Sequence, residues 1–319
     1  MKSILGEIPY VFAGPGLERL AAHRRDPAYI EAALAAADTR FVPLQGAHNI
    51  VVQEGGTPRA LLLDQAEARP LLDQVRLTVL LGSYGGRMCF ALALDEESTL
   101  PRGERADLRM LGVLMQDDEL ALLGYARALV HWHLHNPYCS RCGAATESVH
   151  AGFERVCRNC GTQHFPRLDP AIIVLVTHGE RCLLGRQAGW PEKRYATLAG
   201  FVEPGESLEA AVRREVEEET DVRVGRTLYQ ASQPWPFPSS LMLGFRAEAE
   251  TTAIHCRDGE LEDAAWFSRD DIVRQVAAGE LLLSPSRSIS YRLIRGWFEE
   301  QPSRSFAELS YVDPTLTAR

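Results

Sequence analysis

Residues 200–222 read GFVEPGESLEAAVRREVEEETDV and form the most informative stretch of the chain. Glu215, Glu218 and Glu219 stand at i, i+3 and i+4, so a helix would project all three carboxylates from one side. Carboxylates gathered in this way repel one another unless a cation lies among them, and Mg²⁺ prefers such oxygen ligands. An ordinary charged surface helix explains any one of these glutamates but not the whole pattern. The stretch therefore predicts a divalent-cation site on a helix.

The same stretch contains signals for where this helix begins and which side it buries. The turn Glu203-Pro204-Gly205-Glu206 precedes Ser207, whose hydroxyl can cap the first helical turn. Apolar residues then recur at helical spacing and predict a buried stripe: Leu208, Ala211, Val212 and Val216. We therefore expect an amphipathic helix with its acidic groups beside a packed face.

The second motif consists of two cysteine pairs, Cys139-x-x-Cys142 and Cys157-x-x-Cys160, separated by fourteen residues. This spacing is typical of a zinc ribbon with tetrahedral thiolate coordination. A redox dithiol or ordinary buried cysteines are the alternatives, but a redox motif would not need a second copy. Since four protein ligands leave no open position, we expect one structural zinc ion per chain.

Composition limits the classes of protein that the chain can represent. Its 319 residues, 45% of them hydrophobic, are enough for two or more domains with full cores. A net charge of −9 argues against nucleic-acid binding through a broad positively charged surface. No apolar run reaches the length of about 18 residues that a membrane span needs, and the N-terminus lacks the pattern of a signal peptide. These features predict a cytoplasmic protein.

Four regions follow one another along the chain. Residues 1–130 carry mixed patterns that predict an N-terminal α/β domain, and residues 137–165 form the predicted zinc ribbon. Residues 166–300 contain the acidic helix, and residues 301–319 form a C-terminal tail. The run AIIVLVT at residues 171–177 is typical of a buried strand. Strands and helices here alternate without a regular βαβ repeat, which favours an α/β/α sandwich around a mixed sheet.

A long helix is predicted over residues 117–135, with His131, His133 and His135 near its end. On a helix these three side chains diverge around the axis, so they do not suit a shared metal. We expect them at a solvated helix end, where protonated histidine is favourable.

A proline-rich segment, SQPWPFPSSLM, follows the acidic helix at residues 232–242. Three prolines in five residues exclude a central strand and impose a stiff, extended turn. Such a turn can hold Trp235 and Phe237 so that each ring presents a face to a nucleotide base. Polar groups beside the rings can form hydrogen bonds: Gln233, Ser239 and Ser240. In isolation, a packing turn or an exposed peptide-recognition segment would be the favoured explanation.

The acidic stretch resembles the Nudix box, in which a glycine, a glutamate and an Arg-Glu-x-x-Glu-Glu run recur at fixed spacing. The matching positions are Gly200, Glu206, Arg214, Glu215, Val216, Glu218, Glu219 and Val222. Asp221 departs from the pattern because the family has glycine there. Aspartate tolerates the left-handed conformation that often follows a helix, so we expect the change to affect the turn more than the metal site.

Taken together, the motifs resemble the NADH pyrophosphatase family of Nudix hydrolases. The proline-rich segment at Gln233–Ser240 is similar to the specificity motif of that family, and the zinc ribbon precedes the Nudix box as it does there. This resemblance covers residues 137–298 with specific motifs. It implies a Nudix α/β/α sandwich with a mixed sheet in the C-terminal half of the chain.

The resemblance also implies roles for individual residues. Glu215, Glu218 and Glu219 would form the catalytic group with Arg214, Glu219 activating water and Arg214 orienting the glutamates. The metal ligands would be Glu215, Glu218, Glu219, Glu260 and the backbone carbonyl of Ala199. The substrate-contacting residues would be Phe165, Phe201, Gln233, Pro234, Trp235, Pro236, Phe237, Pro238, Ser239, Ser240 and Ser290.

The activity implied by the resemblance is hydrolysis of the diphosphate of NADH or NAD⁺, with two or three Mg²⁺ or Mn²⁺ ions, to AMP and the nicotinamide mononucleotide. Removal of NAD caps from RNA 5′ ends and assembly as a homodimer, in which an aromatic of one subunit completes the other's site, are implied too. One alternative is a Nudix hydrolase of ADP-ribose or dinucleoside polyphosphates. Another is a zinc-ribbon regulator with a nucleotide-sensing Nudix domain, although the complete glutamate set argues against lost catalysis.

Overall fold

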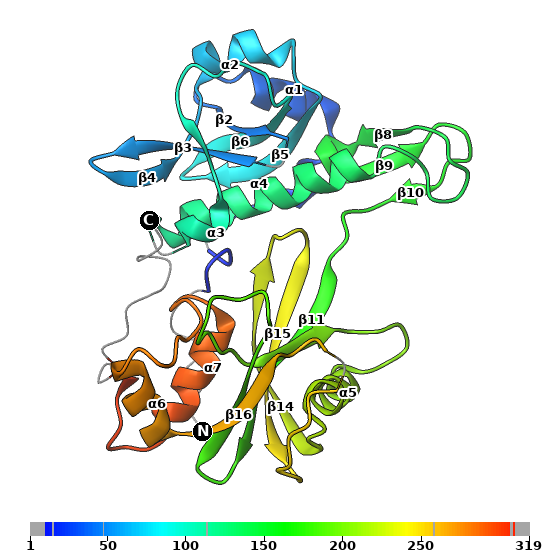
Figure 1. The fold of residues 1–319 in the computed structure, drawn as a ribbon. Coiled ribbons are helices and arrows are strands. Elements are labelled where there is room, and N and C mark those ends of the chain that lie inside the picture. The colour runs from blue at the N-terminus through cyan, green and yellow to red at the C-terminus, as the bar shows by residue number, and fades with distance from the viewer. Residues whose placement is uncertain are drawn as a thin grey trace. The chain divides into compact units, whose positions relative to one another are not determined.

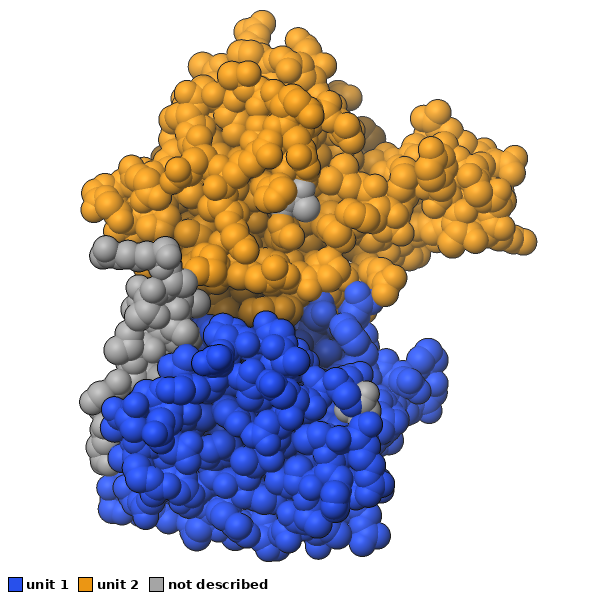
Figure 2. Space-filling view, in the orientation of Figure 1, with its two compact units in different colours: residues 1–10, 169–234, 240–319 blue, residues 11–168, 235–239 orange. Residues whose placement is uncertain are grey.

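The computed structural model describes residues 10–14, 16–46, 48–112, 114–257, 259–306 and 309 (Figure 1). Among these residues the chain forms two compact units, which Figure 2 distinguishes by colour. The N-terminal unit comprises residues 11–168 together with residues 235–239. The C-terminal unit comprises residues 1–10, 169–234 and 240–319, as far as they are described.

The N-terminal unit is built on a seven-stranded sheet of order β1-β5-β6-β2-β3-β4, with β7 paired to β3. Its strands are β1 (Leu17–Glu18), β2 (Arg40–Gln45), β3 (His48–Glu54), β4 (Thr57–Ala60), β5 (Leu77–Tyr84), β6 (Arg87–Leu94) and β7 (Glu104–Ala106). β2 and β6 run parallel and the other pairs antiparallel, so the sheet is mixed.

Helices cover both faces of this sheet because its central strands are apolar on both sides. α1 (Pro27–Ala35) and α2 (Gln65–Leu72) pack on the face that includes Leu80 and Phe90. α4 (Asp117–His135), which confirms the helix predicted over these residues, packs on the face that includes Val79 and Ala91. Shorter turns complete the unit: η2 (Ala21–His23), α3 (Leu108–Leu111) and η3 (His150–Gly152).

The end of α4 differs from the sequence-based expectation. His133 is only 3% exposed, its Nε2 lies 2.8 Å from the carbonyl oxygen of Gly152, and Arg155 donates to its Nδ1 at 2.9 Å. Burial lowers the pKa of His133 to about 4, so the ring is neutral at pH 7. The expected solvated, protonated histidine was therefore wrong at this position, because residues that follow the first cysteine pair fold back over the helix end.

A small antiparallel sheet of order β10-β9-β8 forms the cysteine-rich module at the end of the N-terminal unit. Its strands are β8 (Thr146–Val149), β9 (Glu154–Cys157) and β10 (Gln163–His164). With strands this short and few apolar residues, such a module has little core of its own.

The C-terminal unit contains a six-stranded sheet of order β14-β15-β11-β12-β16, with β13 paired to β11. Its strands are β11 (Asp169–His178), β12 (Arg181–Arg186), β13 (Leu198–Phe201), β14 (Val224–Trp235), β15 (Ser240–Ala249) and β16 (Asp263–Ser268). β11 runs parallel to β15 and antiparallel to β12 and β13, so this sheet is mixed as predicted. β14 lies at an edge, where a strand tolerates Pro234.

Both faces of β11 are buried, which confirms the strand predicted from AIIVLVT. Ile172 and Val174 pack with the apolar stripe of α5 (Leu208–Thr220), whereas Ile173 and Leu175 pack on the opposite face. That face is covered by α6 (Arg269–Ala277) and α7 (Ile289–Phe298). The unit is therefore the α/β/α sandwich that the sequence predicted, with the acidic helix on one side.

The C-terminal tail, predicted from residue 301, is partly built into this sandwich. Phe306 and Leu309 are buried in the same core as α7, and residues 307, 308 and 310–319 lie outside the described residues. No helix within the described ranges combines the length and apolar character needed to cross a membrane.

Candidate active site and zinc centre

The acidic helix α5 begins and ends as its sequence predicts. The hydroxyl of Ser207 accepts a hydrogen bond from the backbone amide of Ala210 at 3.2 Å, which caps the first turn. At the other end Asp221 adopts the left-handed conformation, with φ of 62°. Aspartate therefore takes the backbone conformation that the family's glycine would provide.

The glutamates of α5 differ in burial. Glu215 and Glu219 are 8% and 2% exposed, whereas Glu218 is exposed to solvent. A buried carboxylate is unfavourable unless hydrogen bonds or a cation compensate its charge. The helix therefore holds two acidic groups in an environment where they require positive charge.

Gly200 allows Glu215 to lie directly against β13. A Cβ atom built at Gly200 would lie 1.9 Å from the carboxyl carbon of Glu215 and 2.1 Å from each carboxylate oxygen. Any other residue at this position would therefore displace the carboxylate. Ala199, whose carbonyl was expected to bind metal, directly precedes this glycine in β13.

Arg214 gathers the carboxylates around one guanidinium group. It donates to Glu206 at 2.6 Å, to Glu215 and Glu218 at 2.9 Å each, and to the carbonyl oxygen of Phe201 at 2.9 Å. Its hydrogen bond to Glu206 is the largest cause that raises the pKa of Arg214, and the same bond lowers the pKa of Glu206. One cation thus meets three carboxylates, and negative charge remains in excess.

Burial raises the pKa of Glu215, and the charges of Glu218 and Glu260 act in the same direction, against the lowering effect of Arg214. A site that favours the protonated form of a carboxyl group has an excess of negative charge. A divalent cation can neutralise this charge in place of the proton. Mg²⁺ and Mn²⁺ suit such an oxygen donor set. The residues present therefore fit a hard divalent cation.

Asp221 makes contacts that a glycine could not make. Its Oδ2 accepts from Arg257 at 2.6 Å and lies 3.1 Å from Nδ1 of His255, and the His255 amide donates to the carbonyl oxygen of Thr220 at 2.9 Å. His255 and Arg257 lie on the connection between β15 and β16 that also carries Glu260. The departure from the family pattern thus ties this connection to the end of α5.

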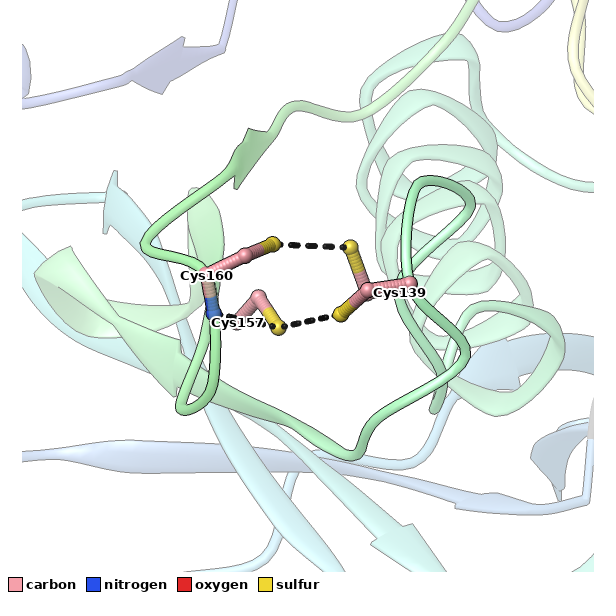
Figure 3. A group of neighbouring side chains, drawn as sticks. Cys139, Cys157 and Cys160 are labelled. Atoms are coloured by element: carbon pink, nitrogen blue, oxygen red, sulfur yellow. Dashed lines mark hydrogen bonds between the residues drawn. The ribbon is translucent and has the colours of Figure 1, made fainter.

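The four cysteines of the ribbon are gathered as their spacing predicts (Figure 3). Their sulfur atoms all lie within 4.8 Å of one another, with 3.7 Å between Cys139 and Cys160 and 3.4 Å between Cys142 and Cys157. A tetrahedral zinc site with bonds of about 2.3 Å needs sulfur separations of about 3.8 Å. The side chain and backbone of Thr162 lower the pKa of the Cys160 thiol to about 6, which favours the thiolate that binds zinc.

The glutamates of α5 are less closely gathered than these thiols. Within the described ranges, the four cysteines are the group of possible ligands whose donor atoms all lie within 4.8 Å of one another.

The predicted substrate-contacting residues fall into three groups. Two aromatic side chains are well exposed, Phe165 at 60% in the N-terminal unit and Phe201 at 61% in the C-terminal unit. They are available to stack on a planar ligand.

The second group is polar, buried and tied to the start of α7. Gln233 is 1% exposed, donates to the carbonyl oxygen of Arg287 at 3.2 Å and accepts from the amide of Ile289 at 2.8 Å. Ser290 is 4% exposed, and its hydroxyl oxygen lies 3.0 Å from that of Thr197. These contacts tie β14 and Thr197, the residue before β13, to the start of α7 through residues that were expected to meet substrate.

The third group is the proline-rich turn itself. Trp235 and Phe237 are partly buried and meet edge to face, with ring centroids 5.2 Å apart. Pro236 is buried, Pro238 is exposed, and Pro234, Ser239 and Ser240 flank the turn. The neighbours of these rings are Phe12, Arg109 and Arg127, which sequence reasoning missed because they lie more than a hundred residues earlier.

Fold and site together define a Nudix-domain protein with a zinc ribbon, and comparison with known families agrees. The NUDIX domain model matches residues 167–285, and the NADH pyrophosphatase zinc ribbon domain model matches residues 134–165. A third model, the NADH pyrophosphatase-like rudimentary NUDIX domain, matches residues 38–132. The chain belongs to the NADH pyrophosphatase family of zinc-ribbon-containing Nudix hydrolases.

Named relatives share less than half of their residues with this chain. The NAD-capped RNA hydrolase NUDT12 of Homo sapiens is 41% identical over 202 residues, which cover 59% of this chain and 44% of that protein. The NAD-capped RNA hydrolase NudC of Mycobacterium tuberculosis is 44% identical over 204 residues, or 61% of this chain and 65% of that protein. The chain thus spans less than two thirds of the length of either relative. A NUDIX hydrolase structure from Nitrosomonas europaea has 20% identity and a TM-score of 0.44, covering 53% of this chain and 93% of its own.

Proposed function

We propose that this protein hydrolyses the diphosphate linkage of NADH or NAD⁺ to the nicotinamide mononucleotide and AMP, with Mg²⁺ or Mn²⁺ as cofactor. The observation that carries the proposal is the carboxylate group of α5. Glu215 and Glu219 are buried, Glu215 lies against Gly200, and Arg214 gathers three carboxylates that leave negative charge in excess.

Each residue of this group has a distinct role in the proposed reaction. Glu215, Glu218, Glu219, Glu260 and the carbonyl of Ala199 would hold the cations. Bound cations would neutralise the diphosphate oxygens and lower the pKa of water. Glu219 would accept a proton from the attacking water, whose oxygen bonds to phosphorus as the bridging P–O bond breaks. Arg214 would keep Glu215 and Glu218 in position.

Selection of a dinucleotide is assigned to the aromatic residues. The exposed rings of Phe165 and Phe201 suit stacking on bases, and the turn with Trp235 and Phe237 resembles the family's specificity motif. The polar residues Gln233 and Ser290 tie β14 and Thr197 to the start of α7 by the hydrogen bonds described above.

NAD-capped RNA is a second proposed substrate. The relatives NUDT12 and NudC are named as NAD-capped RNA hydrolases, and an NAD cap presents the same diphosphate between two nucleosides. A net charge of −9 gives no broad attraction to the RNA body, so recognition is assigned to the cap.

We also propose a cytoplasmic homodimer whose chain divides at the boundaries predicted from sequence. Exposed aromatic residues such as Tyr138 and Phe165, at 68% and 60%, are of the kind enriched in protein interfaces. The zinc would be structural, one ion per chain, because four thiolates complete its coordination. Sedimentation equilibrium of the purified protein tests the dimer directly.

The function is tested by chromatographic separation of products after incubation of purified protein with NADH and Mg²⁺. We expect AMP and reduced nicotinamide mononucleotide in equal amounts, and no products in the presence of a chelator. ADP-ribose and a dinucleoside polyphosphate serve as competing substrates. Faster hydrolysis of ADP-ribose or of the dinucleoside polyphosphate would show that this compound, and not NADH, is the preferred substrate. Absence of hydrolysis of all three would favour the nucleotide-sensing regulator.

A further inference from the structure

The segment Trp235–Ser239 groups with the N-terminal unit, although the strand that leads into it lies in the C-terminal unit. Trp235 and Phe237 pack against the core cluster that includes α4. The proline-rich turn is therefore not an isolated rim. Its surroundings are supplied by the part of the N-terminal unit between Phe12 and Arg127, in which the sequence predicted no site residue.

Three aromatic rings hold one another in this cluster. Phe12 meets Trp235 at a centroid distance of 6.1 Å and Phe237 at 5.6 Å, and both pairs are edge to face. Trp235 and Phe237 meet in the same way. Each ring thus contacts the other two, and a rotation of any one requires the others to move.

Two arginines act on the same turn. The guanidinium of Arg109 lies 4.4 Å from the ring centroid of Phe237, and that of Arg127 lies 5.3 Å from it. Arg127 also donates to the carbonyl oxygen of Pro236 at 3.1 Å. Phe237 and the backbone next to it are therefore held by α3, α4 and a ring from the start of the unit.

Gly124 gives the turn the space that it occupies on α4. A Cβ atom at Gly124 would lie 2.9 Å from Cδ1 of Phe12 and 3.1 Å from Cγ of Pro236. Since both distances are tighter than ordinary packing contacts, a larger residue would push the ring or the proline away. One turn of helix further on stands Arg127, so a single face of α4 supplies both the space and the hydrogen bond.

We propose that this face of the N-terminal unit, formed by Phe12, Arg109, Gly124 and Arg127, is a positioning surface that sets the dinucleotide specificity of the enzyme. It rests on the proposed function, because the turn that it holds is the one assigned to substrate selection. Arg109 and Arg127 are positioning residues: they act through Phe237 and Pro236. Loss of the surface should weaken recognition of a substrate with two bases and leave the carboxylate chemistry of α5 intact.

The kinetic test uses Arg127→Gln and Gly124→Ala in the full-length, zinc-loaded protein, with NADH and ADP-ribose as substrates. Arg127→Gln removes one cation near Phe237 and one hydrogen bond, so we expect KM for NADH to rise roughly tenfold. Gly124→Ala changes no charge and should raise KM in the same direction. For both variants kcat should stay within about twofold of the parent, and ADP-ribose should be affected less.

Matched controls separate this effect from general loss of stability. Arg69→Gln removes an exposed arginine from α2, which packs on the other face of the same sheet. Gly189→Ala adds a methyl group where nothing lies within 4 Å. Neither control should change KM. Arg127→Lys keeps the positive charge beside Phe237 and should restore most of the lost affinity.

A second measurement tests the positioning without activity. In protein labelled with 5-fluorotryptophan, the resonance of Trp235, identified by Trp235→Phe, should shift in Arg127→Gln and Gly124→Ala and stay unchanged in both controls. An unshifted resonance, or lower melting temperatures with unchanged relative KM values for NADH and ADP-ribose, would overturn the proposal. If the parent protein fails to hydrolyse NADH, the proposed function fails, and the resonance still decides whether α4 positions the turn.

Discussion

The helices α4 and α5 lie in different α/β/α units, and each contains buried glutamate. On α4, Glu119 is 5% exposed, pairs with Arg59 at 2.7 Å and accepts from the backbone amide of Ala60 at 3.3 Å. Arg59 lies farther, at 3.8 Å, from the carboxylate of exposed Glu54, so Glu119 is its closest carboxylate partner. On α5, by contrast, Arg214 is shared by three carboxylates, and Glu219 is buried close by in the helix.

This difference shows how two similar folds can serve different purposes. A buried glutamate whose charge is compensated by a close arginine and a backbone amide is a structural group. Several carboxylates that share one arginine are not compensated, so they are suited to bind a cation and act on a phosphate. The same comparison predicts that removal of charge will have opposite effects in the two helices.

The largest expected effect is on turnover. Glu219→Gln keeps the size of the side chain but removes charge from the α5 site, so kcat for NADH should fall by orders of magnitude, about 10²-fold or more. Glu217→Gln, which changes an exposed glutamate of the same helix, should leave kcat unchanged. The measurement is AMP release at saturating Mg²⁺. Equal activity of the two variants would remove the role assigned to Glu219.

The next largest effect is on the stability of the zinc ribbon. There a zinc ion would compensate the negative charge of the thiolates, as a divalent cation would compensate that of the α5 carboxylates. Elemental analysis should find one zinc per chain. Cys157→Ser should lower the zinc content and the melting temperature, because binding of such a metal is coupled to folding. Zinc-free protein with the full melting temperature would contradict the assignment of this site.

A moderate loss of stability is expected from α4. Glu119→Gln removes the closest carboxylate partner of Arg59, and Arg59 is partly exposed, so the loss in free energy of unfolding should be about 1–3 kcal/mol. Metal binding and kcat should not change. Denaturant unfolding measures the loss of stability, and Mn²⁺ titration measures metal binding. A loss of Mn²⁺ affinity would contradict the proposed difference between α4 and α5.

The smallest effect has the opposite sign. Burial raises the pKa of Glu215, so in magnesium-free protein its ionised form destabilises the fold increasingly as pH rises from the ordinary glutamate pKa through the raised value. Glu215→Gln should therefore raise the melting temperature slightly at pH 7 and have little effect at pH 4. The same variant should lose stabilisation by Mg²⁺. A lower melting temperature at pH 7 would show that Arg214 outweighs burial.

The local features of the site could be predicted from sequence. Helix α5 has its cap at Ser207, its apolar stripe and its acidic spacing within one short stretch, and these depend on residues three or four positions apart. The cysteine pairs are equally local. The unbroken apolar run of β11 sufficed to predict a strand buried on both faces, because a strand exposed on one side would alternate.

Other features were decided only by the tertiary structure. His133 is buried because residues beyond the first cysteine pair cover it, and Asp221 meets Arg257 through a connection more than thirty residues away. The setting of Trp235 depends on Arg109 and Arg127. Periodicity and spacing describe how neighbouring residues share a helix or strand. They contain no information on which distant side chains meet once the sheets and helices pack, and there the charge, burial and orientation of these groups are determined.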